Sequence, residues 1–269
     1  MIRRALRLVY RNLLPSRARG YLDLFEEIRR KEAAAPRIVA AGDLEERRVL
    51  ALAPHPDDEV FGCGGTLGLY HQAGASVFVA YMTDGRKGSS AYREEELVGI
   101  REKEAAESSK VLGIDRIFFL GARDGELSRS PAAASKLSGI LAETRPEAIF
   151  LPFLLDGHPD HVATNDVFVA ASRGCPLSFT CYGYEVWTPL PLPNLLVDIS
   201  GSIDLKREAI EKYKSQTENA ALADAAFGLS RYRAVMHGVG RGYAEAFFRC
   251  HASEYLRFWR AATHAPTQA

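Results

Sequence analysis

Short apolar runs alternate with segments of helical periodicity along most of the chain. The apolar runs have the length of buried strands and occupy residues 49–53, 77–82, 116–120, 148–151 and 178–186. Between them, residues 64–73, 94–112 and 132–144 repeat apolar positions at helical spacing. This alternation predicts an α/β fold, Rossmann-like, with a mostly parallel sheet flanked by helices. A further strand is predicted at 195–199, and the chain then becomes mostly helical, at 203–216 and again from Gly242 onward.

The pattern differs at the start of the chain and indicates two regions. We expect residues 1–45 to form an N-terminal extension with a basic amphipathic helix, and residues 46–269 to form a single domain. Apolar and basic side chains recur on opposite faces of that helix, at Ile2, Ala5, Leu6, Val9 and Leu13 and at Arg3, Arg4, Arg7 and Arg11. Such a helix usually packs on its own domain or on another subunit, and peripheral attachment to an anionic membrane is the alternative.

The composition is that of an ordinary globular protein. Of the 269 residues, 47% are hydrophobic and 25% charged, and 34 basic residues balance 34 acidic ones, so nothing indicates a nucleic-acid partner. The four cysteines show no CxxC spacing, which predicts neither a zinc finger nor a disulfide framework. No apolar stretch reaches the roughly 18 residues of a membrane span, and the arginine-rich start is unlike a secretory signal. We expect a cytoplasmic protein, with the basic helix at the inner membrane face as the alternative.

Polar clusters follow four of the predicted strands. His55-Pro56-Asp57-Asp58-Glu59 comes directly after the first strand, and His158-Pro159-Asp160-His161 follows the fourth. Thr83-Asp84-Gly85 and the segment 121–125 follow the two others. Ligands of open α/β sheets bind beyond the carboxyl ends of the strands. We therefore expect these four clusters to converge at one edge of the sheet.

Two histidines and one carboxylate in these clusters form a ligand set for zinc. A catalytic zinc is commonly held by three protein ligands of the His and Asp/Glu kind, with the fourth position open for water. His55, Asp58 and His161 supply that set. The ligand types favour one Zn²⁺ per chain, and other divalent metals bind similar groups.

The remaining cluster residues fit supporting chemistry. Asp57 is adjacent to the predicted ligands and suits a general base that takes a proton from a metal-activated water. His158 could, when protonated, stabilise the oxyanion of a tetrahedral intermediate, or it could pass a proton to a departing amine. Glu59 and Asp160 are expected to orient the imidazoles or to hold the loop. The alternative is that these histidines are only helix caps and surface groups.

The glycines after the first cluster do not form a dinucleotide-binding motif. That motif requires GxGxxG directly after the first strand, whereas here HPDDE intervenes and Gly62, Gly64 and Gly65 have a different spacing. Carboxylates at this position would also repel a pyrophosphate. We expect these glycines to let the following helix pack closely on the sheet.

Together, these motifs resemble the LmbE-like, or PIG-L-like, zinc N-deacetylase family. The resemblance extends over residues 49–248. Besides the HPDDE and HPDH clusters it is carried by Thr83-Asp84-Gly85, residues 101–104 and Asp124, with weaker support from Tyr213-Lys214-Ser215-Gln216 and Tyr243-Ala244-Glu245-Ala246-Phe247. It implies an LmbE-like three-layer fold, with the same metal ligands, Asp57 as the base and His158 as an electrostatic stabiliser.

The resemblance also implies a substrate class. Family members typically remove acetyl from an N-acetylglucosamine unit carried on a lipid, a thiol precursor or a glycoside, and some cleave related amides. By the same similarity, Arg101 and Asp124 would contact sugar hydroxyls or a neighbouring phosphate. We predict a zinc-dependent N-deacetylase that converts the acetamide of an N-acetylglucosamine-type sugar or glycoconjugate to a free amine and acetate. The alternatives are a metal-binding carbohydrate-recognition protein without turnover, an amidase acting on a related non-acetyl amide, and a scaffold.

Overall fold

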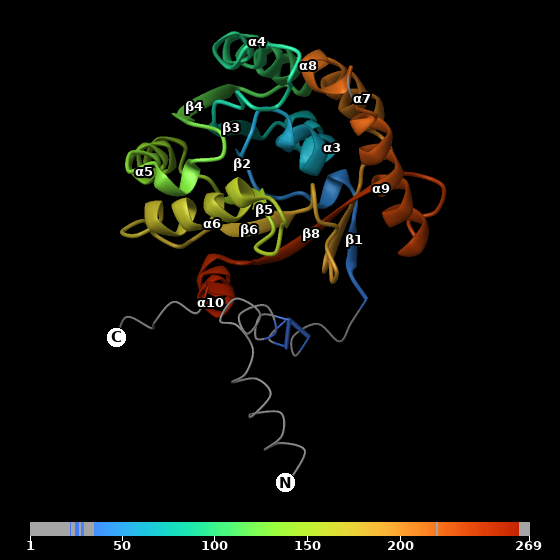
Figure 1. Cartoon of the computed structure of the whole chain (residues 1–269). Helices are drawn as coiled ribbons and strands as arrows, with labels where there is room; N and C mark the ends of the chain where they lie inside the picture. The colour runs from blue at the N-terminus through green and yellow to red at the C-terminus, as the bar shows by residue number, and fades with distance from the viewer. Residues whose placement is uncertain (1–21, 23–24, 27, 30–34, 219, 264–269) are drawn as a thin grey trace, which may run out of the picture.

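The computed structural model describes residues 22, 25–26, 28–29, 35–218 and 220–263. Helices lie on both faces of a mostly parallel sheet, which confirms the predicted α/β fold with three layers (Figure 1). The basic helix predicted near the N-terminus lies outside the described residues. Among the residues that are described, no helix is long and apolar enough to cross a membrane.

The sheet has eight strands in the order β1-β7-β8-β6-β5-β2-β3-β4. β8 pairs antiparallel with β6 and β7, and the other neighbouring strands pair in parallel. The strands are β1 Arg37–Val39, β2 Arg48–Ala53, β3 Ser76–Thr83, β4 Arg116–Ala122, β5 Ala148–Pro152, β6 Thr180–Tyr184, β7 Leu195–Asp198 and β8 Ala244–His251.

Helices connect most of the strands in the described part of the chain. Two short 3-10 helices, Ala41–Asp43 and Leu127–Arg129, lie before β2 and after β4. The α-helices are α3 Asp58–Gln72, α4 Glu94–Leu112, α5 Ala133–Thr144, α6 Pro159–Ala171, α7 Ile203–Glu211, α8 Lys214–Thr217, α9 Leu222–Met236 and α10 Ala252–Thr263.

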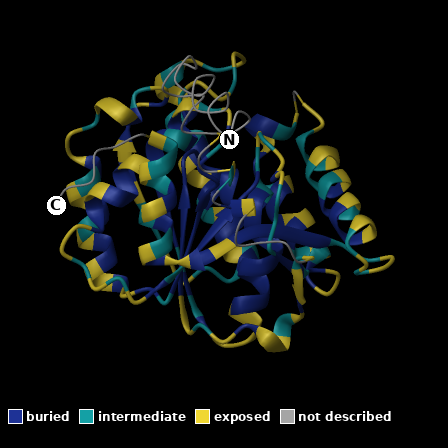
Figure 2. Cartoon of the chain, turned by 90° about the horizontal axis from the view of Figure 1, so that it is seen from below, coloured by how far each residue is buried: buried dark blue, intermediate teal, exposed yellow. Residues whose placement is uncertain are grey.

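The central strands are apolar along their length because helices cover both faces of the sheet. In β2, Leu50 and Leu52 face one hydrophobic core and Val49 and Ala51 face the other, and all four are fully buried. α5, α6 and α10 pack over the first core, and α3, α4 and α7 over the second. The strands are accordingly buried, while exposed residues lie along the outer sides of the helices (Figure 2).

The strand order brings two strand ends together. β2 pairs in parallel with β3 on one side and with β5 on the other, so the direction in which successive strands are added reverses between β2 and β5. Ligands of such sheets bind where this reversal occurs. α3 begins at Asp58, just after β2, and α6 begins at Pro159, shortly after β5. The two titratable clusters of the sequence therefore meet at this point.

The last part of the sheet differs from the sequence prediction. The chain from Gly242 onward was expected to be helical, but Ala244–His251 forms strand β8, and α10 follows it. Ala246 and Phe248 face one core and Phe247 the other, which is the alternation of a strand. Because β8 lies between β6 and β7, pairing with two neighbours outweighs the helix preference of its alanines.

Other boundaries also differ. β1 pairs with β7 but lies before residue 46, so the sheet begins inside the segment assigned to the N-terminal extension. α3 begins at Asp58 instead of residue 64, because the HPDDE turn leads directly into the helix. The helix predicted at 203–216 is divided into α7 and α8, and α9 was not predicted.

The packing of α3 on β6 predicts opposite effects for two glycine substitutions. A Cβ at Gly62 would lie 2.3 Å from Cδ2 of Tyr184, whose hydroxyl donates to the Leu52 carbonyl, whereas a Cβ at Gly64 would meet nothing closer than 3.5 Å. We expect Gly62→Ala to lower the free energy of unfolding by about 1–3 kcal/mol through overpacking. Gly64→Ala should raise it by about 0.5–1 kcal/mol. Urea unfolding measures both, and equal midpoints would contradict this close packing.

Candidate metal centre

Three side chains converge at the carboxyl ends of β2 and β5. His55 lies in the turn after β2, Asp58 in the first turn of α3 and His161 in the first turn of α6. Oδ2 of Asp58 lies 3.0 Å from His55 Nδ1 and 3.2 Å from His161 Nε2. All three side chains are buried. The structure thus brings together the three ligands predicted from the sequence.

Each of the two imidazoles has a carboxylate behind it. His55 Nε2 lies 3.3 Å from Asp160 Oδ2 and 3.4 Å from Asp124 Oδ1, and His161 Nδ1 lies 3.5 Å from Asp156 Oδ2. A carboxylate in this position fixes the tautomer of a metal-ligating histidine, because it attracts the ring N–H and leaves the other nitrogen free to bind metal. Nδ1 of His55 and Nε2 of His161 are therefore the expected ligand atoms.

The hydrogen bonding of His161 is incomplete. The residue is fully buried, yet neither ring nitrogen makes a hydrogen bond to any residue that the structure describes. A buried polar atom without a partner costs on the order of 1–3 kcal/mol. Two imidazole nitrogens and one carboxylate oxygen are the donor set of a zinc site that keeps a position open. A divalent cation fits these residues, since it would bind both His161 Nε2 and the Asp58 oxygen that lies 3.2 Å from it.

Among the residues that the structure describes, side-chain atoms able to bind a metal lie within 4.8 Å of one another in two overlapping groups: His55, His158 and His161, and His55, Asp124 and Asp160. The carboxylates of the second group already accept backbone hydrogen bonds, Asp160 from Gly125 at 2.6 Å and Asp124 from Lys87 at 3.0 Å. In the histidine group, the ring nitrogens of His55 and His161 accept no backbone hydrogen bond from a described residue. Together with Asp58, it is the better candidate for holding a cation.

Opposing charges shape the acidity of the predicted ligands. Burial lowers the pKa of His161, but Asp58 and Asp156 outweigh it and raise this pKa to about 9. Burial also lowers the pKa of His55, and three neighbouring carboxylates raise it well above its usual range. Burial raises the pKa of Asp58, yet the two histidines hold it well below the usual range. The site attracts positive charge, and a metal that binds here displaces protons from the imidazoles.

Asp57 is held beside the ligands in an unusual backbone conformation. Its φ of 131° is one that residues with side chains rarely adopt. The guanidinium of Arg101 lies 2.8 Å from Asp57 Oδ2 and also donates to the carbonyls of Pro56 and Gly85. Burial raises the pKa of Asp57 to about 7, although the charge of Arg101 opposes the rise. A carboxylate with a pKa near neutrality suits a general base.

His158 caps the N-terminus of α6 and faces both predicted ligand histidines. Its ring centroid lies 4.8 Å from that of His55 and 5.1 Å from that of His161. Nδ1 accepts a hydrogen bond from the Asp160 N–H at 3.3 Å, which leaves the ring proton on Nε2. Burial and the charges of the two other histidines lower the pKa of His158. A neutral imidazole in this position can donate from Nε2, and the protonated imidazole considered from the sequence stays a prediction.

Comparison with known proteins identifies the family. The model of the GlcNAc-PI de-N-acetylase family, PIG-L, matches residues 50–172, a range that contains every site residue described above. The probable N-acetyl-alpha-D-glucosaminyl L-malate deacetylase 2 of Bacillus cereus is 31% identical over 187 residues, which cover 64% of this chain and 85% of that protein. The chain belongs to the PIG-L family. The resemblance found in the sequence is thereby confirmed.

Solved structures agree with membership of the PIG-L family. The N,N'-diacetylchitobiose deacetylase of Pyrococcus horikoshii, solved with its inhibitor, is 30% identical and superposes with a TM-score of 0.69 over 78% of this chain and 86% of its own. A 4-carboxy-2-hydroxymuconate hydratase of Pseudomonas putida, 22% identical, has a TM-score of 0.64 over 75% of this chain and 95% of its own. The second likeness shows the fold alone. The reaction therefore has to be argued from the residues of the site.

Glu59 holds the loop that carries two of the predicted metal ligands in this PIG-L family chain. Its Oε1 accepts hydrogen bonds from Tyr81 at 2.9 Å and from Tyr213 at 2.5 Å, and its Oε2 accepts the N–H of Asp57 at 3.1 Å. Burial raises the pKa of Glu59 to about 7, and the hydrogen bonds from both tyrosines oppose the rise. Tyr213 belongs to one of the weaker PIG-L motifs, and its hydrogen bond to Glu59 helps to hold this loop.

The two residues predicted to bind substrate lie within the site. Arg101 is 2% exposed and bonded to Asp57, and Asp124 is 6% exposed and lies against His55. The structure shows what each does in the free protein: Arg101 orients the proposed base, and Asp124 supports a predicted ligand. Their contacts with a sugar remain predictions.

Three residues of the site had no role assigned from the sequence, although Tyr213 lies in one of the weaker motifs. Asp156 lies behind His161 and accepts the N–H of His158 at 2.9 Å, while Tyr81 and Tyr213 hold Glu59. Asp156 follows β5 at the same sheet edge as the other acids, and this position could have revealed it. Nothing in the sequence distinguishes Tyr81 from a tyrosine that only packs in a strand.

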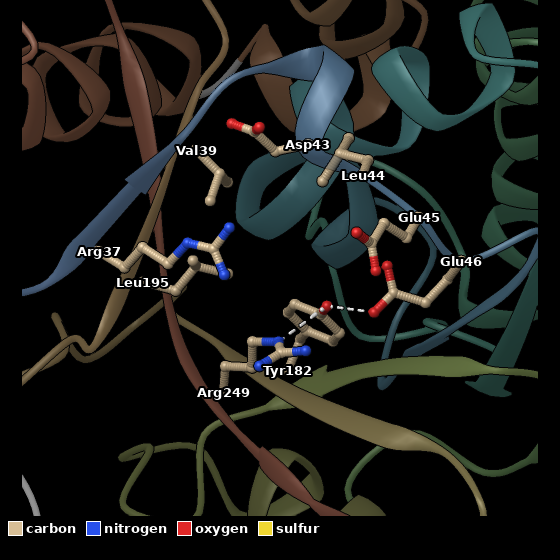
Figure 3. Close-up of a pocket in the computed structure, with 9 residues that line it drawn as sticks. All are labelled: Arg37, Val39, Asp43, Leu44, Glu45, Glu46, Tyr182, Leu195 and Arg249. Atoms are coloured by element: carbon tan, nitrogen blue, oxygen red, sulfur yellow. Dashed lines mark hydrogen bonds between the residues drawn. The ribbon is translucent and has the colours of Figure 1, made fainter.

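A pocket elsewhere on the molecule contains none of these residues. Within it, Tyr182 donates to Glu46 at 2.6 Å and accepts a hydrogen bond from Arg249 at 3.1 Å (Figure 3). It is lined by Arg37, Val39, Asp43, Leu44, Glu45, Glu46, Tyr182, Leu195 and Arg249. Because no histidine lines it and its central polar groups bond one another, it is not a candidate for metal chemistry.

The carboxylate behind His161 predicts an effect on metal affinity. Asparagine keeps the shape of Asp156 but loses its charge, so Asp156→Asn should weaken Zn²⁺ binding by about 10–100-fold. Competition with a chromophoric chelator measures the dissociation constant. Asp166→Asn is the matched control, because Asp166 lies further along α6 and accepts a hydrogen bond from Trp259. Equal affinities for the two variants would show that Asp156 does not tune the site.

Proposed function

We propose that this chain is a metal-dependent N-deacetylase that hydrolyses the acetamide of an N-acetylglucosamine-type sugar or glycoconjugate to a free amine and acetate. The observation that carries the proposal is the convergence of two histidines on one oxygen of Asp58, with Asp57 beside them. Metal-assisted amide hydrolysis requires such a ligand set with a base next to it. The deacetylase names of the Bacillus and Pyrococcus relatives support the same reaction and substrate class.

The donor atoms His55 Nδ1, Asp58 Oδ2 and His161 Nε2 support one Zn²⁺ per chain. When bound, such an ion polarises the amide carbonyl and lowers the pKa of a water molecule to about 7. Nitrogen and oxygen donors favour zinc, and other divalent cations can bind the same groups.

Asp57 acts as the general base. The ion pair with Arg101 engages Oδ2, and we assign the proton transfer to Oδ1. Asp57 takes a proton from the water molecule while the oxygen of that water attacks the acetamide carbon. The same carboxyl group then returns the proton to nitrogen as the C–N bond breaks, so that acetate and a free amine leave. Arg101 prevents the carboxylate from turning away from this position.

His158 stabilises the charge that develops on the acetamide oxygen. Because its Nδ1 is engaged by the Asp160 N–H, the N–H at Nε2 is the donor that remains. One donor of this kind, aimed at a developing oxyanion, typically contributes about 10²–10³-fold to kcat.

We retain the sequence-based proposal that Arg101 and Asp124 contact sugar hydroxyls or a phosphate, supported by their place beside Asp57 and His55.

Removing the base should separate turnover from metal binding. Asp57→Asn keeps the side-chain size and leaves the three ligands in place. We expect its metal content to be unchanged and its acetate release from N-acetylglucosamine-type substrates to fall by about 10²–10⁴-fold. His161→Ala should lose both metal and activity. Metal analysis and an acetate assay on the same preparations measure the two, and full activity of Asp57→Asn would show that another group is the base.

A substrate panel distinguishes the proposal from the other functions. It pairs N-acetylated sugars with the same sugars carrying other N-acyl groups. Metal and sugar binding without acetate release would favour a carbohydrate-recognition protein. Release from non-acetyl amides alone would favour a related amidase, and a chain that binds no metal and releases no acetate would favour a scaffold.

We also infer that the basic segment 1–20 docks on this domain or on another subunit of a cytoplasmic protein, with an anionic membrane as the alternative partner. The opposite apolar and basic faces of the predicted helix support this. Co-sedimentation with anionic vesicles compares the full chain with a variant that lacks residues 1–20. We expect equal pelleting of the two. Pelleting that depends on the segment would favour the inner membrane face.

A further inference from the structure

Trp187 presents a large aromatic ring beside the proposed oxyanion stabiliser. It lies in the connection between β6 and β7 and is 61% exposed. Its ring centroid lies 6.3 Å from that of His158, and the two ring planes are 24° from parallel. Ligand sites are lined mainly by apolar and aromatic side chains, and an exposed indole beside a proposed reacting group is placed to line one.

A buried ion pair closes the loop that carries Trp187. Arg233 donates from Nε to Glu185 Oε1 at 2.9 Å and from Nη2 to Glu185 Oε2 at 2.6 Å. The same guanidinium donates to the Leu190 carbonyl at 2.7 Å, and the Leu190 N–H donates to Glu185 at 2.6 Å. The two ends of the loop, Glu185 and Leu190, are therefore both bonded to the Arg233 guanidinium. The bidentate pair of a guanidinium and a carboxylate is among the strong hydrogen-bonded contacts.

Thr188 ties the same loop to the segment that carries His158. Its Oγ1 accepts the Gly157 N–H at 2.9 Å, and its N–H donates to Asp156 Oδ2 at 3.4 Å. Asp156 in turn accepts the N–H of His158. The backbone at Trp187 thus lies between two anchored points of the loop, next to the segment that carries the imidazole. A surface that is ordered before binding loses less entropy when a ligand arrives.

We propose that Trp187 is the platform on which the pyranose ring of the substrate stacks, an inference that rests on the proposed deacetylase function. One face of a pyranose ring consists of C–H groups, and an exposed indole offers a flat apolar surface of matching size. In the proposed reaction His158 faces the acetamide oxygen. A sugar ring held against Trp187 therefore lies next to the bond that breaks. The platform favours sugars over open-chain acetamides without taking part in proton transfer.

Kinetics of Trp187 variants test this specificity. With an N-acetylglucosamine-type substrate, Trp187→Ala should raise KM by about 3–10-fold and change kcat by less than about twofold, while Trp187→Phe retains most of the affinity. With an open-chain acetamide, KM should be the same for all three proteins. Urea midpoints check that the exposed substitution leaves the fold intact. An unchanged KM for the sugar, or an equal loss with both substrates, would overturn the proposal.

Fluorescence distinguishes a failure of this proposal from a failure of the deacetylase proposal. The chain contains two tryptophans, and Trp259 lies on α10, bonded to Asp166. In the Trp259→Phe variant, the emission reports on Trp187 alone. Titration with N-acetylglucosamine should shift this emission, and glycerol at the same concentration should not. An emission shift without acetate release from any sugar of the substrate panel would support the platform and reject the deacetylase. Acetate release with no emission shift, and with an unchanged KM for Trp187→Ala, would support the deacetylase and reject the platform.

Discussion

The parallel pairing of β2 with β5 is the constraint on which the site depends. The register aligns Val49 with Ala148 and Ala51 with Phe150, so both strands reach the same edge of the sheet together. A slip of one residue would turn every side chain of β2 to the opposite core. His55 and Asp58 follow β2 in the chain, and His161 follows β5. Their convergence is therefore a consequence of strand order, and it needs no long-range contact between the loops themselves.

The balance of buried charge distinguishes the site from the rest of the interior. Elsewhere in the described part of the chain, some buried ions are closely paired. Glu245, for example, accepts hydrogen bonds from Lys206, from the N–H of Gly65 and from both the N–H and the hydroxyl of Thr66. At the candidate metal centre several carboxylates surround two imidazoles, and the ring nitrogens of His161 make no hydrogen bond to a described residue. The contrast with Glu245 favours a cation at the centre, because buried polar groups normally have hydrogen-bond partners.

The parts of the site that the sequence predicted are those that local pattern determines. His55, Asp58 and His161 occur directly after apolar runs, and the end of a strand is readable without knowing its neighbours. β8 could not be read in this way, because its alanines form a strand only when β6 and β7 lie on either side. The position of Trp187 depends on the Glu185–Arg233 pair, which joins residues far apart in the sequence.

The relationship between fold and reaction depends on Asp57. Its backbone conformation costs on the order of 1–3 kcal/mol and persists only where neighbouring groups enforce it. Here Glu59 holds its N–H, and Arg101 holds its carboxylate from α4, a helix whose many charges suggest a solvated surface. α4 supplies none of the proposed metal ligands, yet its Arg101 orients the carboxylate proposed as the base. A chain can therefore keep the sheet, and with it the likeness to a hydratase, while the chemistry is decided by side chains that neither form the core nor bind the metal.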